Sequence, residues 1–204
     1  MFFTFDGVDG AGKSTQTDLF CEWLREQGHD VVTCRDPGST DASEAIRQLL
    51  LSGEVATIGR RCEMLLYMAA RAELVDEVIA PALASGKTIV SDRYLLANVV
   101  YQGHAGGLDI ESIWQVGQLA TKGIVPDLTV VLDIDPEAAA ARRTGPPDRM
   151  ESQGSEFRTR LRKGFQAEAE RSPKDIVVIN AAQTVEQIQS EIRAAATRVL
   201  PSST

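Results

Sequence analysis

The chain has 204 residues, of which 43% are apolar and 25% are charged, proportions typical of a globular protein with one substantial core. Its formal net charge of −8 argues against general binding to nucleic acids, because their phosphate backbones need a basic surface. The sequence has no apolar segment of membrane-spanning length, and its first residues lead straight into a predicted strand without the basic region and long apolar core typical of a signal peptide. We therefore expect a cytoplasmic protein without membrane or nucleic-acid partners, folded as a single domain over residues 1–204.

Short runs of β-branched and apolar residues predict five strands, at 2–5, 31–34, 88–91, 128–132 and 176–179. Helix-length segments lie between them, at 13–27, 41–52, 60–84, 109–121, 136–143, 153–171 and 183–198. This alternation predicts an α/β fold with a five-stranded parallel sheet. Because the strands are almost continuously apolar, helices should cover both faces of the sheet. Ligands of such sheets gather at the carboxyl ends of the strands.

The octet GVDGAGKS at residues 7–14 follows the first strand and has the spacing of a phosphate-binding loop, or P-loop. Its glycines permit backbone conformations in which consecutive N–H groups surround phosphate oxygens, and the next helix directs its positive end at them. Lys13 adds a mobile positive charge. Ser14 fits as a hydroxyl ligand of Mg²⁺, and Thr15 is its adjacent alternative. The motif therefore predicts a nucleotide ligand.

Charged residues also follow the other strands of the predicted sheet. Asp92 and Arg93 come directly after the third strand, where a carboxylate can order the water shell of Mg²⁺ beside a guanidinium that binds phosphate. An ordinary ion pair between the two is the alternative. The segment 35–38 follows the second strand and Asp133 ends the fourth, so we expect four strand ends to meet at one site.

Two residue pairs at helical spacing point to a flat ligand. Tyr67 and Arg71 share one helix face and can present an aromatic plane and a planar donor group to the same molecule. Asn98 and Tyr101 form a second pair of this kind. Burial of the aromatic rings in the core is the alternative for both pairs.

Arginines at 142, 143 and 149 flank the helix-breaking sequence TGPP, which favours a mobile lid around residues 142–154 that brings positive charge over a transferring phosphate. Solvated surface arginines are the alternative. The hypothesis of a lid gains support because position 10 of the P-loop is glycine, so Lys13 is the only cationic side chain of the loop itself. Asp6, Asp9 and Asp36 flank the same region; they can act through Mg²⁺ or orient an arginine, although Asp6 fits a buried ion pair equally well.

The ordered set of motifs resembles the thymidylate kinase family from about Phe2 to near Leu200. The matching segments are DGVDGAGKS (6–14), RDPGST (35–40), LYMAAR (66–71), DRY (92–94), YQG (101–103), PDL (126–128) and DRME (148–151). The chain departs from the usual pattern at Asp6 and Asp36, where Glu is common, and at Ser39, Tyr67 and Ala97. The resemblance implies a P-loop NTPase fold of the nucleoside monophosphate kinase type.

The resemblance also implies roles for individual residues. The ATP-binding residues are then Gly7, Val8, Asp9, Gly10, Ala11, Gly12, Lys13, Ser14 and Thr15. The dTMP-binding residues are Asp9, Asp36, Tyr67, Arg71, Arg93, Asn98, Tyr101 and Gln102, with Tyr67 stacked on thymine and Arg71 bonded to its exocyclic oxygen. The catalytic residues are Lys13, Asp9, Arg93, Arg142 and Arg149, and Ser14 and Asp92 hold the metal.

We therefore expect an enzyme that phosphorylates dTMP to dTDP with Mg-ATP, in dTTP biosynthesis, and that forms a homodimer through helices near 60–84 and 109–121. The alternative enzymes are a deoxynucleoside kinase, whose acceptor is a 5′-hydroxyl, and another nucleoside monophosphate kinase. A nucleotide-triggered switch protein is disfavoured, because the sequence lacks the Asn-Lys-x-Asp motif with which GTPases read guanine.

Overall fold

The computed structural model describes residues 1–52, 57–142 and 153–201. The described residues form a five-stranded parallel sheet with the strand order β2-β3-β1-β4-β5. The strands are β1 (Phe2–Gly7), β2 (Val31–Arg35), β3 (Thr88–Asp92), β4 (Leu128–Asp133) and β5 (Ile176–Asn180). Each predicted run falls within one of these strands, so the predicted α/β fold with a five-stranded parallel sheet is confirmed.

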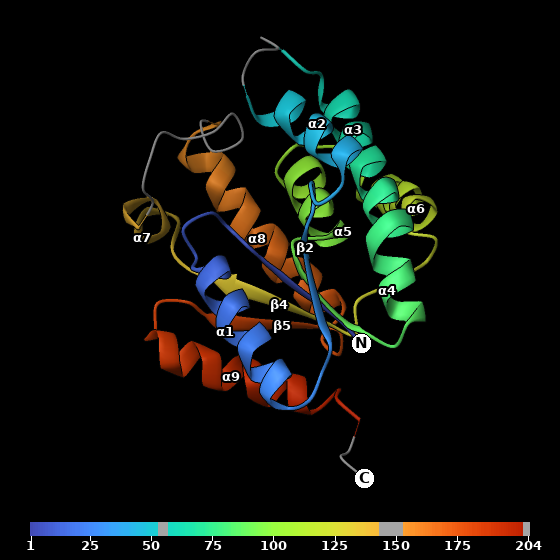
Figure 1. Ribbon diagram of the computed structural model, residues 1–204. Helices are drawn as coiled ribbons and strands as arrows, with labels where there is room; N and C mark the ends of the chain where they lie inside the picture. The colour runs from blue at the N-terminus through green and yellow to red at the C-terminus, as the bar shows by residue number, and fades with distance from the viewer. Residues whose placement is uncertain (53–56, 143–152, 202–204) are drawn as a thin grey trace.

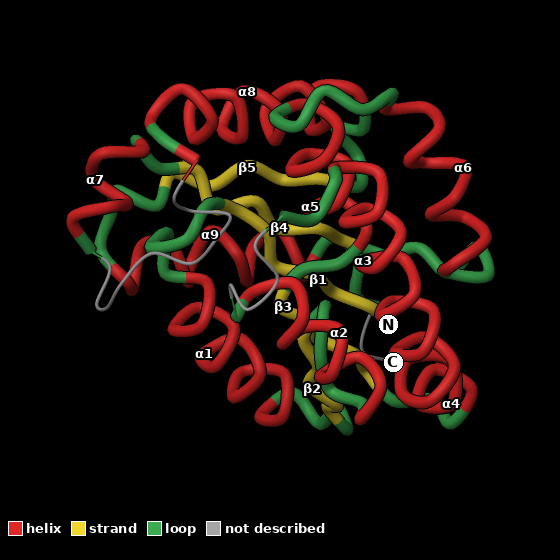
Figure 2. Tube along the Cα trace, turned by 90° about the horizontal axis from the view of Figure 1, so that it is seen from above, coloured by secondary structure: helices red, strands yellow, loops and turns green. Residues whose placement is uncertain are grey.

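Helices cover both faces of the sheet (Figures 1 and 2). They are α1 (Lys13–Glu26), α2 (Asp41–Leu51), α3 (Arg60–Leu74), α4 (Ala80–Ala84), α5 (Leu95–Asn98), α6 (Ile110–Ala120), α7 (Pro136–Ala141), α8 (Ser155–Arg171) and α9 (Val185–Thr197). Seen from above, α1 and α9 lie on one side of the strands, whereas α5 and α8 lie on the other with α3 and α6 beyond them (Figure 2). Residues at or after the carboxyl ends of β1, β2 and β3 line clefts in this arrangement.

The sequence-based assignment missed one helical segment. Residues 95–104 form α5 and a π-helical turn, Val99–His104. The segment has no amphipathic period, because its first six residues are all buried and no polar face alternates with an apolar one. The predicted helix 60–84 is helical throughout, but a second π-helical turn, Val75–Ile79, separates α3 from α4.

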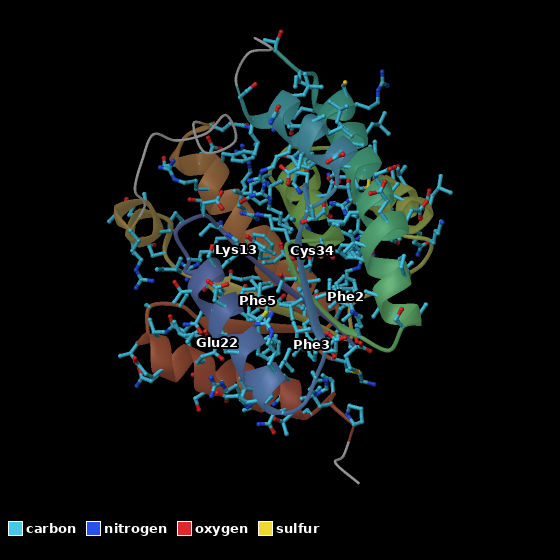
Figure 3. All side chains as sticks on the ribbon, in the orientation of Figure 1. Phe2, Phe3, Phe5, Lys13, Glu22 and Cys34 are labelled. Atoms are coloured by element: carbon cyan, nitrogen blue, oxygen red, sulfur yellow. The ribbon has the colours of Figure 1, made fainter. Side chains whose placement is uncertain are left out.

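The central strand β1 is buried on both faces, as its apolar run predicts. Phe3 and Phe5 pack against Phe20 of α1, with ring centroids 5.2 Å and 5.4 Å apart, and Phe2 packs edge-on against Tyr94 on the opposite face, at 4.9 Å. Figure 3 shows these phenylalanines along β1, with Lys13 beyond the carboxyl end of the strand. The core thus fixes the strand from which the P-loop starts.

The junction between β1 and the P-loop requires glycine at position 7. Gly7 has a φ of +133°, a conformation that L side chains rarely adopt, and a Cβ atom there would lie 2.6 Å from the carbonyl oxygen of Leu132 on β4. The close approach comes from sheet pairing, in which Gly7 is the partner of Leu132. A side chain at this position must therefore push two paired strands apart.

Gly7→Ala is expected to lower the free energy of unfolding by about 3 kcal/mol or more, because it combines backbone strain with a clash against main-chain atoms. Gly28→Ala is the matched control, since Gly28 also has a positive φ of +88° but has open space around its Cβ position. That variant should lose about 1 kcal/mol. Urea denaturation of both measures the difference, and equal losses would contradict the role assigned to the Leu132 carbonyl.

Candidate active site

The P-loop joins β1 to α1, as its motif predicts. Gly10 and Gly12 have φ values of +86° and +93°, and Gly12 immediately precedes the first residue of α1. The ammonium group of Lys13 turns back over the loop and donates to the carbonyl oxygens of Gly7 at 3.1 Å and Val8 at 3.2 Å. It also lies 3.2 Å from a carboxylate oxygen of Asp9. The loop thus holds a buried cation at the amino end of a 14-residue helix, where anions are favoured.

Arg93 lies at the end of β3 and faces the P-loop. Its Nη2 atom donates to Asp9 at 2.6 Å and to the hydroxyl oxygen of Tyr101 at 3.2 Å, and its guanidinium lies over the Tyr101 ring, 5.1 Å from the centroid. Its backbone is left-handed, with a φ of +67°, and its amide N–H donates to Phe5 O of β1 at 2.9 Å. Its Nη1 atom is buried and has no hydrogen-bond partner among the described residues. A desolvated donor of this kind favours an anionic ligand.

The two cations hold Asp9 in its charged form. Burial raises the pKa of Asp9, but the nearby charges of Arg93 and Lys13, together with their hydrogen bonds, outweigh burial and keep the pKa below its usual range. Burial and the neighbouring Arg93 cation lower the pKa of Lys13, an effect that Asp9 and Asp92 oppose. Asp9, Lys13 and Arg93 thus form one coupled electrostatic unit.

One cleft collects every residue that the sequence assigns to an acceptor nucleotide. It has a volume of about 630 Å³ including space open to solvent, and the predicted residues that line it are Asp9, Asp36, Tyr67, Arg71, Arg93, Asn98, Tyr101 and Gln102. These residues come from the P-loop, the end of β2, α3, the end of β3 and the helical segment 95–104. The two pairs at helical spacing, Tyr67 with Arg71 and Asn98 with Tyr101, therefore face the same space.

Arg71 is held rigidly at the floor of this acceptor cleft. It is 1% exposed, and its Nε atom donates to Asp36 at 2.5 Å. Its terminal nitrogens donate to Asn98 Oδ1 at 3.0 Å and to the carbonyl oxygen of Tyr94 at 3.3 Å. Asp36 therefore reaches Arg71 despite its short side chain, and it acts on the cleft by fixing this guanidinium.

A second cleft lies above the P-loop. Its lining includes the predicted nucleotide-binding residues Asp9, Gly10, Gly12, Lys13, Ser14 and Thr15, together with Arg35, Asp36, Arg47, Asp92, Arg93 and Arg142. Of the remaining P-loop residues, Gly7 and Val8 face Lys13 through their carbonyl oxygens, and Ala11 is buried. Asp9, Asp36, Arg47 and Arg93 line both clefts, so two ligands can meet end to end beside Arg93.

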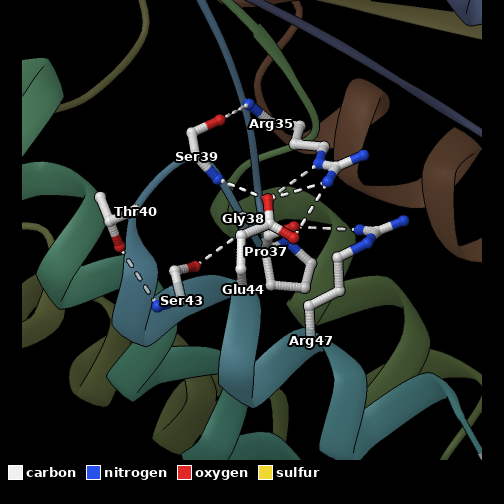
Figure 4. Close-up of polar contacts among 8 residues, drawn as sticks. All are labelled: Arg35, Pro37, Gly38, Ser39, Thr40, Ser43, Glu44 and Arg47. Carbon is white, nitrogen blue, oxygen red and sulfur yellow. Dashed lines mark hydrogen bonds and ion pairs between the residues drawn. The ribbon is translucent and has the colours of Figure 1, made fainter.

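Arg35 belongs to the segment 35–38 that the sequence places at the site, whereas sequence reasoning gave no role to Arg47; both residues add positive charge to the second cleft. Glu44 binds the Arg35 guanidinium through both carboxylate oxygens, at 2.8 Å and 3.0 Å, and also accepts from the backbone N–H of Ser39 (Figure 4). Arg47, one turn further along α2, donates to Pro37 O at 3.0 Å. Arg47 lies four residues after Ser43, whose hydroxyl accepts from the Gly38 N–H, so the two residues share a helix face. This spacing is the sequence signal that could have placed Arg47 beside the segment 37–38.

Comparisons with known proteins agree with this geometry. Residues 5–192 match the family model described as thymidylate kinase. Curated relatives named thymidylate kinase include one from Symbiobacterium thermophilum, 43% identical with 98% of this chain and 94% of the relative covered, and one from Rhodopirellula baltica, 42% identical with 94% and 78% covered. The crystal structure of thymidylate kinase from Ehrlichia chaffeensis superposes with a TM-score of 0.79 at 30% identity, covering 96% of this chain and 98% of that one.

The chain belongs to the thymidylate kinase family. It is therefore an enzyme that phosphorylates dTMP to dTDP, and ATP and dTMP are the substrates that the family implies. The recognition made from the sequence motifs, the P-loop kinase fold and the expected reaction are all confirmed. The roles of individual residues stay predictions.

The kinase differs from the sequence-based expectation at the fourth strand end. Asp133 was expected to join the site, but Arg162 of α8 binds it through two hydrogen bonds, at 2.7 Å and 2.8 Å. Asp133 therefore binds a residue of α8 and is not among the residues that line the two clefts. Arg142 does line the second cleft, and it donates to Ala181 O at 2.8 Å. Arg143, Arg149 and most of the expected lid at 142–154 lie outside the described residues.

The residues expected to hold Mg²⁺ lie together. Ser14 and Asp92 line the second cleft, and Asp92 Oδ1 is buried without a hydrogen-bond partner in the described part of the chain. Oxygen donors of this kind fit Mg²⁺, which keeps several waters and binds through few protein ligands. The described residues contain no group of three or more acidic, histidine or cysteine side chains that could enclose a metal, and no described helix is long and apolar enough to cross a membrane.

Asp6 lies directly beneath the site at the end of β1. It is fully buried, and neither of its carboxylate oxygens has a hydrogen-bond partner among the described residues. The ion-pair alternative considered for this residue is therefore wrong. Burial raises the pKa of Asp6 to about 7, although the positive charges of Arg93 and Lys13 act in the opposite direction.

This pKa makes the stability of the kinase depend on pH. The unfolded chain releases the Asp6 proton near pH 3.8, whereas the folded protein keeps it up to about pH 7. Between these values the folded state binds more protons, so the free energy of unfolding falls as pH rises. Relative to Asp6→Asn, the wild type should lose about 2–4 kcal/mol between pH 4 and pH 7.5. Urea denaturation across this range measures the effect, and parallel curves for the two proteins would rule it out.

Proposed function

We propose that the γ-phosphoryl group of ATP passes directly to a phosphate oxygen of dTMP, with no covalent enzyme intermediate. The observation that carries this mechanism is the overlap of the two clefts at Asp9 and Arg93, which allows the donor and the acceptor to meet in line. The acceptor phosphate is itself the nucleophile, so the protein contributes alignment and charge stabilisation.

At the acceptor end, Arg93 binds the phosphate of dTMP through Nη1, the buried donor that lacks a partner among the described residues. Asp9 and Tyr101 hold Arg93 in position by accepting hydrogen bonds from its other terminal nitrogen, Nη2. Tyr67 stacks on thymine and Arg71 donates to an exocyclic oxygen of the base. Because Arg71 is fixed by Asp36 and Asn98, it offers its donors in one orientation only, which favours selection by geometry.

At the donor end, the backbone N–H groups of residues 7–15 and the ammonium group of Lys13 bind the phosphates of ATP. Lys13 is bonded to the carbonyl oxygens of Gly7 and Val8, and phosphate oxygens can replace these neutral partners with charged ones. Ser14 would hold Mg²⁺ directly and Asp92 would order its water shell. When bound, the ion neutralises charge on the β- and γ-phosphates. Arg35 and Arg47, which also line this second cleft, add positive electrostatic potential to it.

Residues 142–154 act as a mobile lid in this proposal, and an arginine of the lid stabilises the charge that develops on the transferring group. Arg142, at the beginning of this segment, already lines the second cleft. Its bond to the carbonyl oxygen of Ala181 is with a neutral partner, which a phosphate can replace.

Arg142→Ala and Arg149→Ala are expected to separate lid catalysis from substrate binding. Loss of a contact made only in the transition state lowers kcat, so the catalytic member should lose about 100-fold or more in kcat with a much smaller rise in the KM for ATP. Arg25→Ala, at an exposed position near the end of α1, is the matched control and should leave both constants unchanged. Steady-state kinetics measure this, and full turnover in both lid variants would exclude a catalytic arginine in the lid.

We further propose that the kinase forms a homodimer through α3 and α6. These helices pack on each other and carry exposed leucines, Leu65 (49% exposed) on α3 and Leu119 (82%) on α6. The proposal follows the family resemblance, and the exposed leucines lie on the two helices that it assigns to the interface between the copies. A cytoplasmic location stays a prediction from the sequence.

A coupled assay of ADP formation tests the proposed function across dTMP, dUMP, dCMP, AMP and thymidine, with Mg²⁺ and with a chelator. We expect dTMP to be the best acceptor, dUMP to be about 10–200-fold less efficient because it lacks one methyl group, and activity to vanish with the chelator. Phosphorylation of thymidine in preference to dTMP would indicate a deoxynucleoside kinase. ADP formation without any acceptor would contradict the proposal.

A further inference from the structure

A continuous chain of buried hydrogen bonds runs from α3 to the floor of the acceptor cleft. Gln102 Nε2 donates to Glu63 Oε1 at 2.8 Å, Asn98 Nδ2 donates to Gln102 Oε1 at 2.7 Å, and Arg71 Nη1 donates to Asn98 Oδ1 at 3.0 Å. Each of these residues is at most 2% exposed. Arg71, Asn98 and Gln102 line the cleft, and Glu63 lies behind them in the first turn of α3.

The two ends of this chain decide the direction of every bond in it. A carboxylate oxygen can only accept, and a guanidinium can only donate. The amides of Gln102 and Asn98 can each be turned by 180°, which exchanges their donor and acceptor atoms. With Glu63 at one end and Arg71 at the other, only one orientation of both amides satisfies all three bonds. Turning either amide would place two oxygens, or two N–H groups, against each other.

The orientation of these amides matters because they line the space assigned to the base. Thymine presents an N3–H donor between two carbonyl acceptors, whereas cytosine presents an N3 acceptor and an amino donor. The amide oxygens of Asn98 and Gln102 each accept one bond within the chain and keep a second lone pair. A wall whose amides cannot turn can therefore match one base edge and reject the other.

We propose that Glu63 is a positioning residue that sets the selectivity for thymine over cytosine by fixing the direction of the Gln102 and Asn98 amides. The inference rests on the proposed function, because it requires the base to lie in the acceptor cleft. Glu63, Tyr67 and Arg71 lie on the same face of α3, at positions i, i+4 and i+8. This helix therefore supplies both residues of the cleft wall and the residue that supports the wall.

Glu63→Gln tests the inference, because it keeps the size and shape of the side chain but can donate as well as accept. In the variant, the reversed direction of both amides is opposed only at Arg71, and no longer at both ends of the chain. We expect the ratio of kcat/KM for dTMP over dCMP to fall by about tenfold or more, through a higher KM for dTMP with kcat within about threefold of the wild type. Where dCMP is not turned over, its inhibition constant against dTMP replaces its kcat/KM in the ratio.

The substrate dUMP is the internal control for this variant. It presents the same hydrogen-bonding edge as dTMP and differs only by a methyl group, so the dTMP-over-dUMP ratio should stay at its wild-type value. Glu168→Gln is the control for loss of a buried acid elsewhere, since Glu168 is 3% exposed and bonded to His104. It should leave both ratios unchanged. Gln102→Met interrupts the chain from its middle and should reproduce the selective loss, even if Glu63→Gln fails to fold.

The outcomes separate the inference from the function on which it rests. A wild-type enzyme that prefers dTMP, with Glu63→Gln and Gln102→Met variants that keep its dTMP-over-dCMP ratio, would overturn the role of Glu63 alone. A parallel fall of the dUMP and dCMP ratios would also overturn it, because this pattern indicates a generally loosened cleft. Failure of the wild type to phosphorylate dTMP would instead overturn the proposed function.

Discussion

The ion pair between Asp9 of the P-loop and Arg93 at the end of β3 links the two halves of the site. Its 2.6 Å bond joins a loop that follows one strand to a guanidinium that follows the neighbouring strand, and both residues line both clefts. Two hydrogen bonds to its main chain maintain the left-handed backbone of Arg93: its N–H donates to Phe5 O, and its carbonyl oxygen accepts from the Ser91 hydroxyl. Local strain at such a position persists only where surrounding structure determines it, which is typical of functional sites.

Three cations of the site, Lys13, Arg71 and Arg93, have carboxylate partners. Arg71 is paired with Asp36, and Lys13 and Arg93 share Asp9, whereas Arg47 and Arg142 donate to the carbonyl oxygens of Pro37 and Ala181. Lys13 nevertheless directs two of its bonds at carbonyl oxygens, and one Arg93 nitrogen has no partner within the described residues. These incompletely paired cations are where phosphate groups gain most, because charge-assisted bonds to desolvated donors are strong.

The π-helical turn Val99–His104 helps to shape the acceptor cleft. Ala97, Asn98, Tyr101 and Gln102 all line that cleft, although they occupy two adjacent turns of one helical segment. Gln102, which belongs to this turn, is bonded to both Asn98 and Glu63. Single π-helical turns occur frequently at functional sites, and here the turn directly follows α5 along the wall of the acceptor cleft.

The sequence by itself determined the parts of this protein that depend on local spacing. The five strands, the P-loop and the Tyr67–Arg71 face could be read directly, because strand and helix periods and the GVDGAGKS spacing are local properties of the chain. The reaction followed from the ordered motifs, because together they specify a family.

Only the tertiary structure decided which partners the charged residues have. Asp133 was expected at the site but is bound by Arg162 of α8, and Asp6 was considered for an ion pair but has no partner among the described residues. The helical segment 95–104 was missed because its first six residues are all buried and the segment has no amphipathic period. Arg47 and Glu63 act through contacts with residues of other elements. Partners of this kind depend on how the elements pack, which the pattern of each separate segment does not contain.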